Sequence, residues 1–96
     1  MPEYNVYYEL LVRTEGGTGS KLVLPGVVLP FVPYPKLKIR FGSEVVGEEI
    51  PIRCSEVEWV EEADTFELTL ETIEVYKIDK LEPVIKKLLG YGFELA

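Results

Sequence analysis

A run of acidic side chains between residues 56 and 64 is the feature of this sequence that could do chemistry. Carboxylates at this density could bind a divalent cation, cleave a glycosidic bond as an acid and base pair, or dock a basic partner. A calcium loop needs alternating Asp and Asn with a glycine at its sharp turn, which this run lacks. Glycoside cleavage normally needs a deep cleft, which a small domain seldom encloses. We therefore predict no metal site and no catalytic residue, and we interpret the run as a solvated hairpin tip and candidate interaction surface made of Glu56, Glu58, Glu61, Glu62 and Asp64.

The remaining residue types argue against most enzymatic chemistry. The sequence has no histidine and one cysteine, Cys54. This composition excludes zinc sites built from nitrogen and sulfur ligands, and it excludes histidine-dependent catalytic triads. Cys54 shares its strand parity with Ile50 and Ile52, so we expect it in the core and unreactive, because a reactive thiol needs exposure and a cationic neighbour. The sequence therefore predicts a protein that is not an enzyme and uses no cofactor.

A basic stripe occupies alternate positions of one predicted strand, at Lys36, Lys38 and Arg40. Basic stripes with nearby aromatic residues are typical of nucleic-acid binding, but three cations are few. Carboxylates occur at the same spacing on later predicted strands, where cross-strand pairs on a solvated face would neutralise the stripe. These expected partners are Glu56, Glu58, Glu67 and Glu71.

The formal net charge of −7 is concentrated in one block of the chain. Residues 44–74 contain eleven acids and a single base, whereas residues 1–43 carry +2 and residues 75–96 carry +1. Such a block repels phosphates, so we expect no nucleic-acid partner and favour a basic protein partner. The leading prediction is a small interaction or assembly module that uses this acidic face. The alternatives are a small-molecule or divalent-cation binding protein and an accessory subunit of an enzyme.

The hydrophobic pattern has a period of two along most of the chain, which is typical of half-buried strands. Residues 4–12 alternate on one face and keep apolar residues on the other, which predicts a central strand. Residues 21–24 predict its hairpin partner, and Pro25-Gly26 predicts a turn. Three prolines within residues 30–35 remove ladder donors, so this stretch is predicted to be a connector that rounds a corner of the fold.

The middle of the sequence predicts strands that bend. Residues 37–41, 50–59 and 66–75 alternate between apolar and polar side chains, but the parity changes near Ser55 and again before Ile73. Parity changes inside long strands indicate β-bulges or bends, and a strongly curved sheet or small barrel needs them at its corners.

A helical period replaces the strand period near the end of the chain. Asp79 with Glu82 resembles a capping box, an apolar stripe at helical spacing comes next, and Gly90 is a suitable residue just past the end. Together the elements predict one α+β domain over residues 1–96. Its architecture would be a curved, mainly antiparallel sheet or small open barrel of five to six strands with one C-terminal helix. We expect the helix to cover either the second face of the first strand or an open end of the barrel.

Three further expectations concern the core, assembly and location. Residues 91–95 carry little charge and no proline, so they would be a poorly protected edge strand. If they lie at an edge, we expect a two-fold dimer through them. The alternative is a monomer in which they pack under the proline connector. The sequence shows no secretion signal or membrane span, which predicts a cytoplasmic protein without a membrane partner, and its Lys and Glu enrichment is typical of thermophiles. The predicted core contains Tyr8, Leu10, Leu37, Ile39, Phe41, Ile52, Trp59, Phe66 and Leu68.

Overall fold

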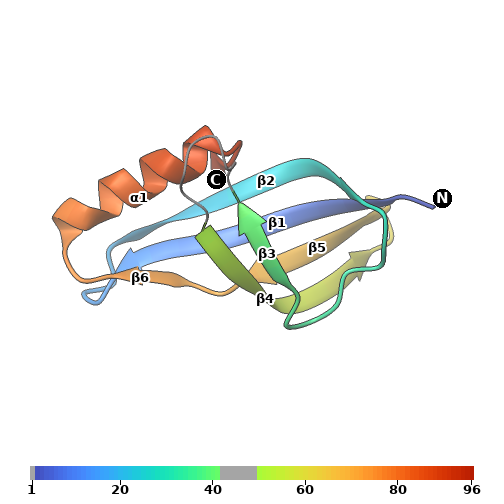
Figure 1. The fold of residues 1–96 in the computed structure, drawn as a ribbon, viewed down its shortest axis with the longest axis horizontal. Helices are drawn as coiled ribbons and strands as arrows, with labels where there is room; N and C mark the ends of the chain where they lie inside the picture. Colours follow the sequence, from blue (N-terminus) through green and yellow to red (C-terminus); the bar gives the residue numbers. More distant parts are fainter. Residues whose placement is uncertain (1, 42–49) are drawn as a thin grey trace.

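The computed structural model describes residues 2–41 and 50–96, which form a curled, open half-barrel of strands with one helix (Figure 1). The predicted α+β class, with a curved sheet and one C-terminal helix, is confirmed. The sheet of the described residues has seven strands, of which the last two are very short. In chain order the elements are β1 (Tyr4–Thr14), β2 (Gly19–Leu29), β3 (Lys38–Phe41), β4 (Ile50–Val60), β5 (Thr65–Leu70), β6 (Ile73–Val75), α1 (Ile78–Gly90) and β7 (Glu94–Leu95).

The strands are arranged in the order β3-β4-β5-β1-β2-β7, and β6 continues beside β1. The first strand is central, in agreement with its two-sided apolar pattern. Most neighbours are antiparallel, but β1 runs parallel to β5 and to β6. These parallel pairs arise because β2 occupies one side of β1, and the chain returns to the other side only after the long connector and the β3–β4–β5 meander.

The Pro25-Gly26 pair is a β-bulge, and the predicted turn at this position is wrong. The register between β1 and β2 shifts between Val6 and Tyr8, so both residues of the pair oppose Tyr7 alone. A bulge accepts these residue types, because Pro25 has no N–H to donate and Gly26 has a φ of 72°, in the left-handed region that glycine tolerates. The strand therefore continues past the bulge as one element.

Both predicted parity changes occur where the chain bends. The register of β4 against β5 shifts between Cys54 and Glu56, which confirms the bulge expected near Ser55. The second change falls between the end of β5 and Ile73, where the chain stops pairing with β4 and extends along β1 as β6. These two bends let the sheet curl around its inner face.

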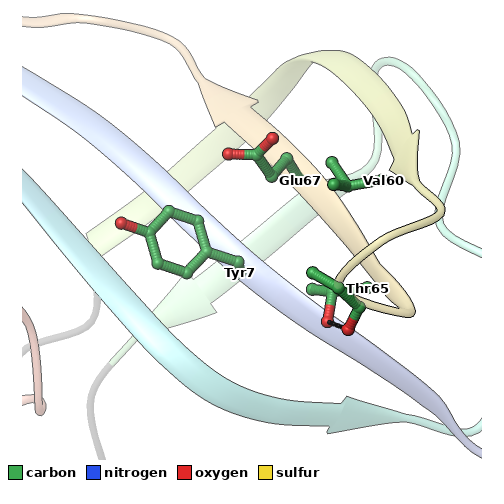
Figure 2. Close-up of a pocket in the computed structure, with 5 residues that line it drawn as sticks. Tyr7, Val60, Thr65 and Glu67 are labelled. Atoms are coloured by element: carbon green, nitrogen blue, oxygen red, sulfur yellow. Dashed lines mark hydrogen bonds between the residues drawn. The ribbon is translucent and has the colours of Figure 1, made fainter.

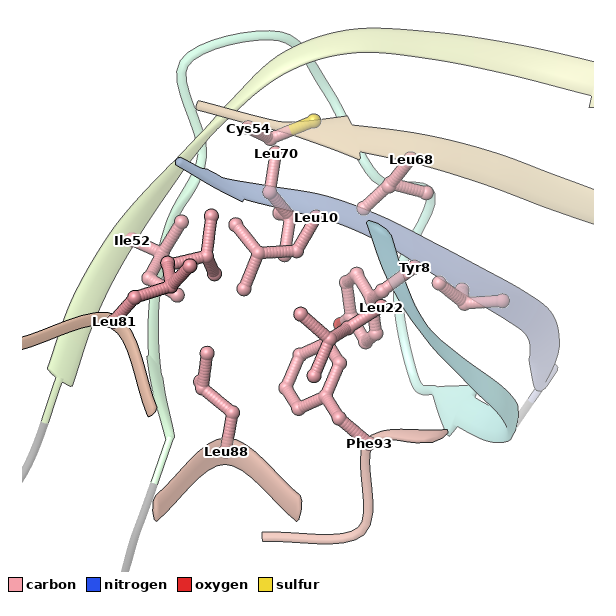
Figure 3. Packing of buried hydrophobic residues seen from close by; sticks show 12 residues of the cluster. Tyr8, Leu10, Leu22, Ile52, Cys54, Leu68, Leu70, Leu81, Leu88 and Phe93 are labelled. Atoms are coloured by element: carbon pink, nitrogen blue, oxygen red, sulfur yellow. The ribbon is translucent and has the colours of Figure 1, made fainter. Parts of the chain in front are cut away.

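The core lies on the inner, concave face of the sheet, where α1 covers one end (Figure 3). Leu81 and Leu88 of α1 and Phe93 beyond it pack against buried side chains of four strands. The helix thus covers an end of the half-barrel, one of its two expected places, and leaves the second face of β1 open. Of the predicted core, Tyr8, Leu10, Ile52 and Leu68 are buried, Leu37, Ile39 and Phe66 are half-buried, and the side chain of Phe41 lies outside the described residues.

Trp59 is 48% exposed, so its predicted burial is wrong. Its predicted parity is correct, because Trp59 lies opposite Phe66 on the inner face, with ring centroids 4.8 Å apart. The helix, however, contacts β1 and β6, at the opposite end of the sheet from the β4–β5 hairpin that carries Trp59 (Figure 1). A strand pattern shows which face a residue occupies, but the length of the covering helix decides how much of that face is buried.

The helix ends differ from the sequence prediction. The N-cap residue is Lys77, without a side-chain capping bond, and Asp79 lies inside the first turn, where its charge favours the helix dipole. The predicted capping box is therefore wrong. Gly90 is the last helical residue, and Gly92, with a φ of 107°, supplies the left-handed conformation after the helix. This turn directs Phe93 back into the core.

The chain after the helix forms the edge strand β7, in agreement with its pattern. β7 pairs antiparallel with β2 over two residues, Leu95 opposite Leu22 and Glu94 opposite Val23. The N–H of Ala96 adds a bond to the carbonyl of Lys21 at 2.9 Å. A dimer through this edge stays a prediction, and the shortness of β7 means that such a dimer would have to pair along β2 as well.

Gly19→Ala is expected to lower the free energy of unfolding by about 1–3 kcal/mol, as other overpacking substitutions do. A Cβ at Gly19 would clash with the carbonyl oxygen of Val12 and lie 2.7 Å from the Cβ of Arg13, so the β1–β2 hairpin would have to shift. Gly16→Ala, in the same hairpin, is the control, because its nearest neighbour is Thr14 Oγ1 at 3.8 Å. Urea denaturation measures both variants, and equal stability of the two would contradict the close approach at Gly19.

Candidate functional site

The outer face of the sheet, turned away from α1, brings carboxylates of three strands together. Glu58 on β4 lies directly opposite Glu67 on β5, and Glu67 lies opposite Tyr7 on β1. Glu56 and Glu9 occupy the same face, one step along their strands. We call this surface the acidic outer face and define it by Glu9, Glu56, Glu58 and Glu67 around Tyr7.

The other three residues of the predicted interaction surface lie at the adjoining hairpin tip. Glu61, Glu62 and Asp64 are exposed in the turn between β4 and β5. The N–H of Asp64 donates to the carbonyl of Glu61 at 3.2 Å, and the carbonyl of Asp64 accepts a bond from Asn5 Nδ2 at 3.4 Å. Backbone groups thus hold the turn, and its carboxylates are free to face solvent.

At the centre of the acidic outer face, Glu58 and Glu67 hold negative charge that no cation of the described residues pairs with. Within residues 2–41 and 50–96, neither Glu58 nor Glu67 forms an ion pair or a hydrogen bond through its side chain. Glu9 contacts Lys21 at 3.5 Å, at the far end of the face. Like charges directly opposite each other across two strands destabilise a sheet. The register thus makes two like charges cross-strand neighbours, an arrangement that a cation beside them would stabilise.

The basic stripe lies beside the start of β4, and the predicted cross-strand pairing with Glu56, Glu58, Glu67 and Glu71 is wrong for Lys36 and Lys38 among the described residues. The register of β3 against β4 places Lys38 opposite Arg53 and Arg40 opposite Pro51. The Lys36 N–H donates to the carbonyl of Cys54 at 2.8 Å, so the stripe ends beside the β4 bulge. Within residues 2–41 and 50–96, neither Lys36 nor Lys38 forms an ion pair with the four carboxylates. The outer surface of β4 consequently has a basic end and an acidic end.

An open pocket of about 270 Å³ lies on the acidic outer face (Figure 2). The ring of Tyr7 and the carboxylate of Glu67 come from neighbouring strands, and the rest of the lining is Val60, Ala63 and Thr65. Sequence analysis missed Tyr7 and Glu67 as site residues, because only the parallel register of β1 and β5 brings them together. The available signal was their shared position on polar strand faces. The pocket can hold a flat or slender cationic group against the ring.

The described part of the chain contains no group of three or more acidic, thiol or imidazole side chains arranged to hold a metal ion. The carboxylates of the acidic outer face are spread along strands, so they do not converge on one point as the ligands of a calcium ion do. Among the same residues, no helix is long and apolar enough to cross a membrane.

Cys54 is buried, as predicted, and its Sγ donates a hydrogen bond to the carbonyl of Glu56 at 3.2 Å. Burial raises the pKa of the Cys54 thiol above its ordinary value. Burial also raises the pKa of the Tyr8 phenol, and the charge of an ionised Cys54 would raise it further. A protonated, inaccessible thiol is a poor nucleophile, so Cys54 belongs to the core and not to a reactive site.

Alkaline pH is expected to lower the stability of the fold. The folded chain keeps the Cys54 and Tyr8 protons to higher pH than the unfolded chain. The contribution of these two groups to the free energy of unfolding is therefore complete below their unfolded pKa values. It is lost as the pH rises through those values toward the higher folded pKa values. Urea denaturation at pH 7 and pH 10 measures the loss. Cys54→Ala should lose less stability over this interval than the native chain, and an identical loss would contradict the burial effect at Cys54.

Moderate salt is expected to raise the melting temperature of the protein. Salt screens exposed charges over roughly 8–10 Å at about 0.1–0.15 M ionic strength, which weakens the repulsion between Glu58 and Glu67 and their neighbours. Thermal denaturation followed by circular dichroism measures the effect, and Glu67→Gln should reduce it. A melting temperature that falls steadily between low and moderate salt would contradict a concentrated acidic face.

Comparison of the chain with protein-family models, with curated proteins and with solved structures found no match. No function is therefore transferred from a relative. The acidic outer face and the pocket beside Tyr7 are the features from which a function can be proposed.

Proposed function

We propose that this protein is a non-enzymatic interaction module that binds a basic protein partner through the acidic outer face. The observation that supports this proposal is the direct apposition of Glu58 and Glu67, with no cation paired to either among the described residues. Like charges held side by side cost free energy, and a partner that places a cation between them recovers it. The face is also uncovered, because α1 packs on the opposite side of the sheet.

The hairpin tip would assist the encounter. Glu61, Glu62 and Asp64 extend the negative potential of the face toward solvent. Complementary charge raises association rates and selects partners more than it raises affinity. A basic surface would therefore meet the tip first and settle on the strands. If the partner with this basic surface is an enzyme, this chain would be its accessory subunit. Nucleic-acid phosphates would be repelled by the carboxylates.

Backbone amide NMR separates this function from cation or small-molecule binding. We would titrate the full chain with a capped tetralysine peptide, and separately with Ca²⁺ and Mg²⁺. We expect saturable shifts over residues 56–67 with the peptide, weakening as salt rises because the contacts are electrostatic. Glu58→Gln should weaken peptide binding, and Glu82→Gln on α1 is the control, since it removes the same charge from the other side of the sheet.

The outcomes distinguish the candidates. Saturable shifts around residues 56–64 with a metal ion alone would favour the cation-binding alternative. Absence of peptide binding at low salt, or an equal effect of Glu58→Gln and Glu82→Gln, would contradict a specific acidic docking face.

A further inference from the structure

We propose that the pocket beside Tyr7 is a subsite for an arginine side chain of the basic partner. This inference rests on the proposed function and narrows it, because it names the group that enters the acidic outer face. It depends on the pocket and the aromatic ring as well as on the surrounding charge.

Three neighbouring strands place the necessary groups in one row. Tyr7 on β1 is the register partner of Glu67 on β5, and Glu67 is the register partner of Glu58 on β4. Adjacent strands lie roughly 4.7–4.9 Å apart, so the row from the ring to the second carboxylate spans on the order of 10 Å. Figure 2 shows the Tyr7 ring and the Glu67 side chain next to each other in the pocket. Glu67 is the middle member of this row, so a cation bound to it lies about one strand spacing from the strands of Tyr7 and Glu58.

The ring and the carboxylate have unused binding capacity. Tyr7 and Glu67 are both half-buried, and neither side chain has a hydrogen-bond partner among residues 2–41 and 50–96. A half-buried carboxylate without a partner is partly dehydrated, which strengthens its attraction to a cation that reaches it. The small side chains of Ala63 and Thr65 leave room beside the ring, and Val60 offers an apolar contact to the methylene groups of a long side chain.

This lining favours arginine over lysine. A guanidinium group is planar and weakly hydrated, stacks on aromatic faces and donates two parallel bonds to one carboxylate. An ammonium group is a compact, strongly hydrated point charge that gains less from a ring. Arginine on the Tyr7 face can therefore bond to Glu67 while its positive charge also relieves the repulsion between Glu67 and Glu58.

Two capped peptides test the preference: one with four arginines spaced by glycine and serine, and one with lysine at the same positions. Amide NMR titration of the full chain at low salt should show the arginine peptide binding about two- to fivefold tighter, the fold-change expected from stacking at an exposed site. Tyr7→Leu should remove this preference and retain the affinity for the lysine peptide. Tyr7→Phe should keep the preference, because the ring and not the hydroxyl provides it.

Wild-type protein gives an independent measurement that does not depend on how a variant folds. Contacts between the Tyr7 ring protons and arginine side-chain protons should appear as cross-relaxation signals in the complex. Glu67→Gln should weaken the binding of both peptides, with Glu82→Gln again as the control of equal charge. Absence of ring contacts in the wild-type complex would overturn the arginine subsite.

The result also separates this inference from the proposed function. Equal affinity for the two peptides, unchanged by Tyr7→Leu, would overturn the arginine subsite and leave the acidic docking face in place. Failure of both peptides to bind would overturn the docking face itself. If the free chain self-associates and Arg53→Gln abolishes this self-association, the arginine comes from a second copy of this chain. That result would overturn the proposal that the partner is a separate protein.

Discussion

Leu68→Ala is expected to lower the free energy of unfolding by about 2–5 kcal/mol, as for other large-to-small core substitutions. Leu68 is 0% exposed and lies on the inner face of β5, in the cluster that joins the sheet to α1 (Figure 3). The substitution removes buried methyl groups and leaves a cavity that rigid neighbouring strands cannot fill. Because domains of this size have stabilities of about 5–15 kcal/mol, the loss would be a large part of the total. Urea denaturation with a constant m-value would measure it.

Leu11→Ala is the matched control for this prediction. It is the same substitution on a neighbouring strand, but the Leu11 side chain lies on the outer face and is exposed. We expect a loss below about 1 kcal/mol, because exposed positions have little apolar contact to lose. Equal losses for Leu68→Ala and Leu11→Ala would contradict the assignment of the core to the inner face.

The burial of Leu68 also shows what local sequence pattern can predict. Alternation along β1 and β5 correctly placed Tyr8, Leu10 and Leu68 in the core, because a period of two reports which face of a strand is apolar. The bulge near Ser55 was visible for the same reason, since an extra residue reverses the parity of the residues after it. These properties are local, and each needs only a few consecutive residues.

Properties that depend on distant segments could not be predicted in this way. Trp59 has the parity of a core residue, but its burial depends on where α1 ends along the sheet. Pro25-Gly26 has the composition of a turn, but β2 pairs with β1 both before and after these two residues, which makes them a bulge. Both residue patterns are compatible with two structures, and tertiary contacts select one of them.

The residues of the candidate site likewise fall into two groups, those that local sequence predicts and those that only tertiary pairing brings together. Glu56 and Glu58 were recognised from sequence, because a dense acidic run needs no structural context. The pocket was not, because Tyr7 and Glu67 meet only through the parallel pairing of β1 with β5, across most of the chain. The pairing of Glu58 with Glu67 likewise depends on the register of the β4–β5 hairpin, which the bulge near Ser55 helps to set. The sequence pattern thus located the acidic residues but not the aromatic ring and pocket that lie beside them.

Leu88→Ala is expected to lower the free energy of unfolding by about 2–5 kcal/mol, whereas Leu89→Ala should cost far less. The two leucines are consecutive residues of α1, but Leu88 is 0% exposed in the core and Leu89 is 39% exposed. Both substitutions replace leucine with a slightly better helix former, so intrinsic helix propensity cannot explain a difference between them. The difference instead measures how strongly docking onto the sheet stabilises the helix, since a helix of this length is marginal by itself in water. Urea denaturation measures both variants, and hydrogen exchange of the α1 amides shows whether the helix detaches before the sheet unfolds. Equal losses, or unchanged protection of α1 in Leu88→Ala, would contradict a helix held in place by the inner face of the sheet.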